Sequence, residues 1–350
     1  MTNSENDFFC LIKEFYNEHF WETIRPSQLL AIQLSDREEP VFISIVGDDD
    51  TERGVFIYRS IEELTTYFET HQWSAERDAW TPFQFRANHT CIALKFIDRT
   101  DLTAREYKLI KDTGVPFRGK RAWPILSDYA QGFEPAPMKE KDEFLMKSIL
   151  SILIEERIFL SKIEEYEQTL EEFDIPLIKR GKEMSVKKEA YTLPIDLITG
   201  AIQSKEGEQP VWLSPFEIKR VQSLPLGRSL WEMDMQYINT PITVSDQERK
   251  MYPKLFLLSD PARKVVLESE VLLQNQVEKL QRIIIQKMIG ENVRPPQIAI
   301  EGIQAAKFVP LIKNLLNEID VDFLIVEELP YLTMVKEQLR DEIDEDKTNQ

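Results

Sequence analysis

The sequence predicts an α/β protein with mixed sheets, of the α+β kind, that is divided into two domains. Its 350 residues are the length of two ordinary domains. Hydrophobic residues make up 42% of the chain and aromatic residues 10%, which is enough apolar material for a core in each domain. Short apolar runs typical of strands alternate with stretches in which apolar residues recur every three or four positions, the period of a helix.

Proline and glycine set the predicted domain boundaries. Between residues 172 and 215 they interrupt every long periodicity, which is typical of a linker between domains. We therefore predict an N-terminal α/β domain over 1–174, a junction over 175–210, a C-terminal α/β domain over 211–340 and a disordered acidic tail over 341–350.

Periodicity and helix-capping patterns give the elements of the first domain. Two pairs have the spacing of a capping box, Ser60 with Glu63 and Thr103 with Glu106, and each should open a helix. The region 117–137, rich in proline and glycine, is expected to be a loop. The remaining elements are helices at 7–20 and 139–170 and strands at 41–46, 55–58 and 91–97.

The second domain is expected to become regular near Tyr252. Strands at 255–258 and 265–267, then helices alternating with strands at 298–300 and 323–326, give the order β-β-α-β-α-β-α. The last helix opens at Pro330. This order matches the core of RNase H-like enzymes, so an RNase H-like fold is one interpretation of the C-terminal domain.

Charge and motif content exclude several classes of function. The net charge of -18 opposes attraction to nucleic acid or to anionic membranes. The glycine-rich loops that bind nucleotides and the Gly-x-Ser-x-Gly, His-Glu-x-x-His and Cys-x-x-Cys motifs are absent from the sequence. We therefore predict no catalytic residues, no metal ligands, no cofactor and no membrane partner. Two cysteines and an N-terminus without a basic signal region favour a cytoplasmic protein.

One segment stands out against this acidic background. The run Phe117-Arg118-Gly119-Lys120-Arg121-Ala122-Trp123-Pro124 holds three cations and two large aromatic residues. Arginine binds carboxylates and phosphates through two parallel donors, and tryptophan offers a stacking surface. The functional interpretation is an anion or acidic-peptide site formed by Arg99, Arg118, Lys120 and Arg121 beside Trp123. The structural interpretation, which we favour, is that these cations pair with the chain's own carboxylates while Phe117 and Trp123 anchor the loop in the core.

Two weaker patterns suggest a metal. His89 and Cys91 are two residues apart, so they share one face of a strand and form half of a metal site at most. Asp260, Glu301 and Glu337 fall near the positions at which RNase H-like nucleases hold two metal ions. However, the helical period turns Glu337 away from the buried face of its helix. An inactive relative of that fold therefore fits better than an active nuclease.

The helix expected at 139–170 raises the question of self-association. Leu150, Ile154, Ile158 and Leu160 widen its apolar surface beyond one stripe. Such a surface suits either a second subunit, as in a homo-oligomer, or burial within one core.

The chain resembles an uncharacterised bacterial two-domain family whose domains are both catalogued as domains of unknown function. The first resemblance lies in residues 94–135, through Arg99 and the Phe117–Pro124 run, and the second in residues 294–332, through Arg294, Pro295 and a strand-helix-strand rhythm. The resemblance implies a two-domain intracellular protein and supplies no substrate or catalytic residue. Our leading hypothesis is a non-catalytic cytosolic protein that binds another protein or a small anion. The alternative is a metal-dependent nuclease-like enzyme, or an inactive relative, built on the C-terminal domain.

Overall fold

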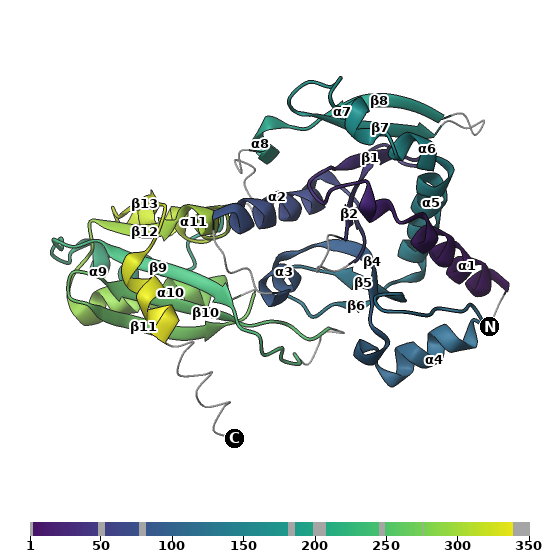
Figure 1. Cartoon of the computed structure of the whole chain (residues 1–350). Coiled ribbons are helices and arrows are strands. Elements are labelled where there is room, and N and C mark those ends of the chain that lie inside the picture. Colours follow the sequence, from purple (N-terminus) through teal and green to yellow (C-terminus); the bar gives the residue numbers. More distant parts are fainter. Residues whose placement is uncertain are drawn as a thin grey trace. The chain divides into compact units, whose positions relative to one another are not determined.

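The computed structural model describes residues 3–47, 53–76, 82–180, 186–198, 208–244, 249–274 and 276–338. The chain divides into two compact units, each with its own sheet (Figure 1). Unit 1 comprises Met1–Ala75 and Asn88–Ile198, and unit 2 comprises Glu76–Ala87 and Thr199–Gln350. The fold is therefore of the mixed α/β class with two mixed sheets, as predicted. The predicted tail at 341–350 lies outside the described residues.

Unit 1 is built on an eight-stranded sheet of order β6-β5-β4-β3-β2-β1-β7-β8. Neighbouring strands are antiparallel except for β1 and β7, which run parallel. The strands are β1 (Leu30–Gln33), β2 (Val41–Val46), β3 (Arg53–Tyr58), β4 (Cys91–Ile97), β5 (Trp123–Tyr129), β6 (Ala136–Pro137), β7 (Asp174–Arg180) and β8 (Val186–Thr192).

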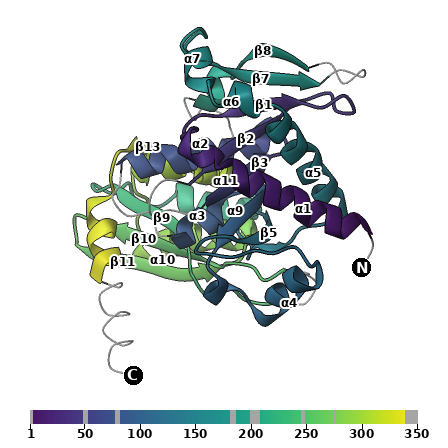
Figure 2. The ribbon, with the colours of Figure 1, turned by 45° about the vertical axis from the view of Figure 1, so that its right-hand side comes forward.

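Two helices form the main core of unit 1 with one face of this sheet. Figure 2 shows α1 (Asn3–Glu18) and α5 (Glu140–Glu155) side by side. Phe15 of α1 and Ile149 of α5 are fully buried against Ile43, Ile57 and Leu94 of the sheet, where alternate residues face the same side. The other helical elements of unit 1 are η1 (Phe20–Glu22), α2 (Ile61–Glu76), η2 (Arg99–Asp101), α4 (Ala104–Asp112), α6 (Arg157–Leu160), α7 (Ile163–Glu167) and α8 (Ile195–Ile198).

The loop predicted over 117–137 is wrong for its second half, which holds β5 and β6. Proline made this region look irregular, but Pro124 pairs with Phe96 of β4 inside the ladder. Proline is tolerated where a strand has an open edge, and the next strand, β6, covers only Ser127 and Asp128.

The single long helix predicted over 139–170 is also wrong, because the chain forms α5, α6 and α7 instead. The backbone leaves helical geometry at Glu156 and again at Lys162. Because the chain changes direction at these breaks, apolar residues from different sides of the predicted helix can point into the same core. Leu150, Ile154 and Leu160 are consequently buried in the core of unit 1, whereas Ile158 is 73% exposed.

The junction predicted over 175–210 contains structure that belongs to unit 1. Strands β7 and β8 extend the sheet next to β1, and α8 follows them. In β8 only Val186 and Tyr191 are half-buried, and its Lys187, Lys188 and Glu189 are exposed. Because β8 has a weak apolar pattern, the sequence did not indicate a strand there, and the proline and glycine residues led to the prediction of a junction.

Unit 2 holds a five-stranded sheet of order β11-β10-β9-β12-β13. β9 is antiparallel to β10, which is antiparallel to β11, whereas β9, β12 and β13 run parallel. The strands are β9 (Trp231–Tyr237), β10 (Lys254–Asp260), β11 (Val265–Leu272), β12 (Gln297–Glu301) and β13 (Asp322–Val326). The helices are α3 (Pro82–Asn88), α9 (Pro215–Gln222), α10 (Val277–Glu291), α11 (Gly302–Glu318) and a last helix over 330–338.

The sequence prediction omitted β9, the central strand of this sheet. Its apolar residues Trp231, Met233 and Met235 face α9, α10 and α11, while its acidic residues face the last helix. The observed order therefore has three strands, not two, before the first crossover helix. α3 also lies within the predicted first domain, 1–174, yet Phe83 packs its ring 5.1 Å from that of Tyr252 in unit 2.

Candidate ligand-binding pocket

The pocket of unit 1 is positioned by helix α4, whose start is fixed by a capping box. Thr103 accepts the backbone N–H of Glu106 at 3.3 Å, and the Glu106 carboxylate accepts the backbone N–H of Thr103 at 2.8 Å. These bonds satisfy two backbone groups that a helix start leaves unpaired. This box was predicted correctly, and Gly114, at φ 72°, follows the helix in the left-handed region that glycine favours.

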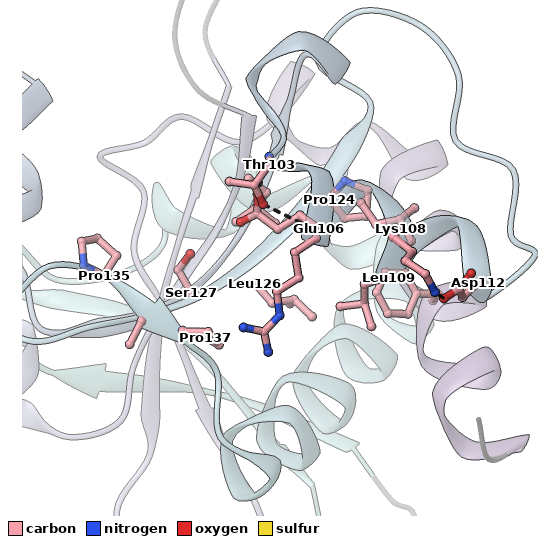
Figure 3. Close-up of a pocket in the computed structure, with 15 residues that line it drawn as sticks. Thr103, Glu106, Lys108, Leu109, Asp112, Pro124, Leu126, Ser127, Pro135 and Pro137 are labelled. Atoms are coloured by element: carbon pink, nitrogen blue, oxygen red, sulfur yellow. Dashed lines mark hydrogen bonds and ion pairs between the residues drawn. The ribbon is translucent and has the colours of Figure 1, made fainter. Parts of the chain in front are cut away.

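A cavity of about 550 Å³ lies between α4, β5 and β6 (Figure 3). This volume is within the range of small-molecule sites. Most of its wall is apolar, from Phe9, Leu109, Ile110, Pro124, Ile125, Leu126, Pro135, Ala136 and Pro137. The polar lining residues are Thr103, Arg105, Glu106, Lys108, Asp112 and Ser127.

The charged residues of the pocket differ in whether they have partners. Glu106 is held by Thr103, and Lys108 binds Asp112 at 2.6 Å, as the dashed lines of Figure 3 mark. Arg105 is exposed and has no hydrogen bond or ion pair to any residue that the structure describes. The pocket thus combines an apolar wall with one guanidinium available to a ligand.

Of the residues of the predicted cationic site, Arg99 and Trp123 lie beside Tyr107 of α4, and none of the five lines the pocket. The Arg99 guanidinium lies 4.7 Å from the centre of the Tyr107 ring, and that ring lies 5.5 Å from the ring of Trp123. Trp123 and Phe117 are buried, with 7% and 3% of their surfaces exposed. The structure therefore brings Arg99 close to Trp123 through Tyr107. It gives Trp123 the core role that the structural interpretation assigned to it.

In the cationic loop, the backbone of Arg121 is bound to Asp98, whereas Arg118 and Lys120 project into solvent. The backbone N–H of Arg121 donates to the carboxylate of Asp98 at 2.6 Å, and Arg121 and Gly119 both adopt positive φ. Arg118 and Lys120 are exposed and make no ion pair with any described residue. The expected pairing of these two side chains with carboxylates of the chain is therefore not found within the described ranges.

A buried charged cluster in unit 1 was missed from the sequence. Arg59 lies 2.7 Å from Glu63, 3.4 Å from Asp128 and 3.3 Å from Asp142. Burial raises the pKa of the Glu63 carboxyl, against the opposing effect of Arg59. Of the capping box predicted for α2, one hydrogen bond is present, from the backbone N–H of Glu63 to the Ser60 hydroxyl. The Glu63 carboxylate accepts the backbone N–H of Arg59 instead of that of Ser60. Only Arg59 and Glu63 are close in the sequence, four residues apart, whereas Asp128 comes from β5 and Asp142 from α5, so no local pattern predicts the cluster as a whole.

His89 and Cys91, the proposed half of a metal site, are buried side chains with other surroundings. The His89 ring nitrogen Nε2 lies 3.1 Å from the hydroxyl of Tyr58, and both side chains are buried. Burial raises the pKa of the Cys91 thiol, which disfavours the thiolate that binds metals. Within the described ranges, no three His, Cys, Asp or Glu residues lie close enough together to hold a metal ion.

The acidic residues predicted in unit 2 have structural partners or face solvent. Asp260 accepts the backbone N–H groups of Ala262 and Arg263 and binds the Arg263 guanidinium at 2.8 Å. Glu337 is exposed, as its helical position predicted, and Glu301 is buried at the end of β12.

Two further carboxylates of unit 2 came from the omitted strand β9. Glu232 accepts the backbone N–H of Leu332 at 2.9 Å, at the start of the last helix. Asp234 binds Lys336 of the same helix at 2.7 Å. The alternation of apolar and polar residues from Trp231 to Tyr237 is the period-two signal that could have revealed this strand.

Comparisons with known proteins also divide the chain in two, although the first match includes residues 76–87, which the structure assigns to unit 2. Residues 6–174 match the family model described as "Domain of unknown function (DUF7309)", which contains the pocket and the cationic loop. Residues 217–340 match the model described as "Domain of unknown function (DUF6930)". No curated protein and no solved structure matches the chain. No helix among the described residues is long and apolar enough to cross a membrane. The chain therefore joins a DUF7309 domain to a DUF6930 domain, the two-domain organisation that the resemblance implied, and both families are of unknown function.

Proposed function

We propose that the protein is a non-catalytic binding protein whose unit 1 holds an amphipathic anion in the pocket between α4, β5 and β6. The observation that carries this proposal is Arg105, a cation without a described partner on the rim of an apolar cavity. Acidic residues outnumber basic ones in this chain, 61 to 43, so internal carboxylates are plentiful. An anionic group would bind this guanidinium through charge-assisted hydrogen bonds while the apolar body fills the cavity.

The neighbouring charges support the same ligand class. Glu106 and Asp112 would repel an anion, but each already accepts a bond, from Thr103 and from Lys108. A cationic ligand would have to share these carboxylates with the donors that they already bind. A cytoplasmic location belongs to the proposal and is supported by the net charge of -18 and by two cysteines that are both free thiols.

Calorimetry with octanoate as the probe tests this proposal. Octanoate should bind the whole chain, whereas octanol and octylamine should bind at least about tenfold more weakly, since a charge-assisted hydrogen bond contributes about 1.5–3 kcal/mol. Arg105→Ala should remove the preference for the acid. Arg118→Ala, the matched loss of an exposed cation outside the pocket, should leave binding unchanged. Equal affinity for the three probes, or no binding at all, would overturn the proposal.

The alternative function, a metal-dependent nuclease built on unit 2, is less well supported. The strand order β11-β10-β9-β12-β13 suits an RNase H-like fold. However, Asp260 and the β9 carboxylates Glu232 and Asp234 are all engaged in structural contacts. In particular, the Lys336 ammonium occupies the position beside Asp234 that a cation would need. These contacts favour an inactive relative of that fold.

A further inference from the structure

The wall of the pocket is an open edge of the sheet. β6 pairs only with Ser127 and Asp128 of β5, whereas the part of β5 from Trp123 to Leu126 pairs with β4 alone. In an antiparallel strand, alternate residues direct their backbone groups to opposite sides. Half of the backbone groups in this segment therefore point away from β4. The consecutive residues 124–127 all line the pocket.

This edge lacks the charged residues found at the opposite edge of the same sheet. β8 carries the exposed charged residues Lys187, Lys188 and Glu189, which discourage pairing with another strand. The open segment of β5 has the sequence Trp-Pro-Ile-Leu and carries no charge. Pro124 removes one backbone donor but leaves every carbonyl group.

We propose that the ligand of this pocket is the C-terminal end of an extended peptide. The peptide pairs with the open edge of β5 as an added strand, and its terminal carboxylate binds Arg105. Alternate apolar side chains enter the cavity beside Leu109 and Leu126. Four residues of an extended chain cover about 13 Å, so a tetrapeptide matches the open segment. This inference rests on the proposed function and specifies the chemical class of its ligand.

The charge and shape of the site favour a peptide terminus over an internal segment. An internal segment brings no carboxylate unless a side chain supplies it, and it would leave Arg105 without a partner. A peptide also uses the backbone groups of β5, which a fatty acid cannot pair. The two ligand classes therefore differ in whether backbone hydrogen bonds contribute to affinity.

The experiment compares three forms of one probe, an acetylated tetrapeptide of alternating threonine and valine. The forms are the free acid, the C-terminal amide and the free acid with its backbone nitrogens methylated. Binding to the full-length protein is measured by calorimetry. The free acid should bind best, and the amide and the methylated form should each bind at least tenfold more weakly. Arg105→Ala should abolish the difference between acid and amide, whereas Lys120→Ala should preserve it.

The outcomes separate this inference from the proposed function. If octanoate binds in an Arg105-dependent way but methylation of the peptide changes nothing, the pocket takes small anions and the peptide inference is overturned. If neither octanoate nor any peptide binds, the proposed function fails as well. Protection of the β5 amides from hydrogen exchange by the free-acid peptide, and not by octanoate, would support strand addition.

Discussion

Lys336 of the last helix lies 2.7 Å from the carboxylate of Asp234 on the central strand β9 of unit 2. The side chains are 14% and 2% exposed, so the ion pair is shielded from water. One turn earlier in the same helix, the backbone N–H of Leu332 donates to Glu232. Two acidic residues of one strand thus hold the helix against the sheet.

Replacing Lys336 with methionine should strongly destabilise unit 2. The change leaves Asp234 buried without its partner, and breaking a buried pair in this way costs about 3–5 kcal/mol. Hydrogen exchange at β9 and at the last helix measures the loss for this unit alone. Glu337→Ala, an exposed change on the same helix, is the control and should stay within about 0.5 kcal/mol. Joint replacement of Asp234 and Lys336 by leucine should recover most of the stability, and a stable Lys336→Met variant would contradict the assigned role.

The Glu63 carboxyl should make the stability of unit 1 depend on pH. Burial raises its pKa above the ordinary value of 4.5, so the folded state binds its proton more tightly than the unfolded state. Its contribution to the free energy of unfolding is therefore complete below pH 4.5 and is lost as pH rises through the folded-state pKa. The charged groups that act on it are Arg59 and Asp128, and Asp142 lies 3.3 Å from Arg59.

Urea unfolding of the wild-type protein and of Glu63→Gln between pH 4 and 7 isolates this contribution. The wild type should lose stability relative to the variant as pH rises, because only the wild type has a proton to release. A difference that stays constant, or that grows in favour of the wild type, would show that the Glu63 pKa is not raised.

Alanine substitution in the exposed and in the buried part of the cationic loop should change the free energy of unfolding by different amounts. The double variant Arg118→Ala and Lys120→Ala should change the free energy of unfolding by less than about 0.5 kcal/mol, since neither side chain has a described partner. Trp123→Ala should cost about 3–5 kcal/mol, because the ring is buried beside Tyr107. Thermal unfolding compares the two. A large loss in the double variant would mean that the cations do stabilise the loop.

Local patterns predicted most of the elements that the structure contains. β2 and β4 begin and end where their apolar runs do, and the box of Thr103 and Glu106 forms as expected. These features depend on residues a few positions apart. The failures have a common cause as well. β5 contains Pro124, and β9 alternates apolar residues with carboxylates, so neither looks like an apolar strand until its partners in the sheet are known.

The candidate site was harder to predict than the fold. The sequence drew attention to Arg118 and Trp123 because their types are concentrated in one segment. It gave no reason to select Arg105, one of several charged residues on an exposed helix. Arg105 gains significance only because β5 and β6 form a cavity beside α4 and because Lys108 and Glu106 have other partners. Both conditions depend on tertiary structure.

The capping box of α4 should influence ligand binding as well as stability. Thr103→Ala removes the hydroxyl that binds Glu106, which costs about 1 kcal/mol. It also leaves the Glu106 carboxylate, in the pocket that Arg105 lines, with only its bond from the Thr103 backbone, so that the carboxylate competes better with an anion for Arg105. The affinity for octanoate should therefore fall several-fold, and Thr103→Ser should restore both properties.

Unit 2 offers a matched control, since Ser214 and Glu217 form the same box at the start of α9. Ser214→Ala should cost a similar amount of stability and leave octanoate binding unchanged. Calorimetry on Thr103→Ala, Thr103→Ser and Ser214→Ala separates the effect on stability from the effect on octanoate affinity. If Thr103→Ala lowers stability without changing affinity, Glu106 does not reach the ligand, and the anion lies further along β5 than Arg105 implies.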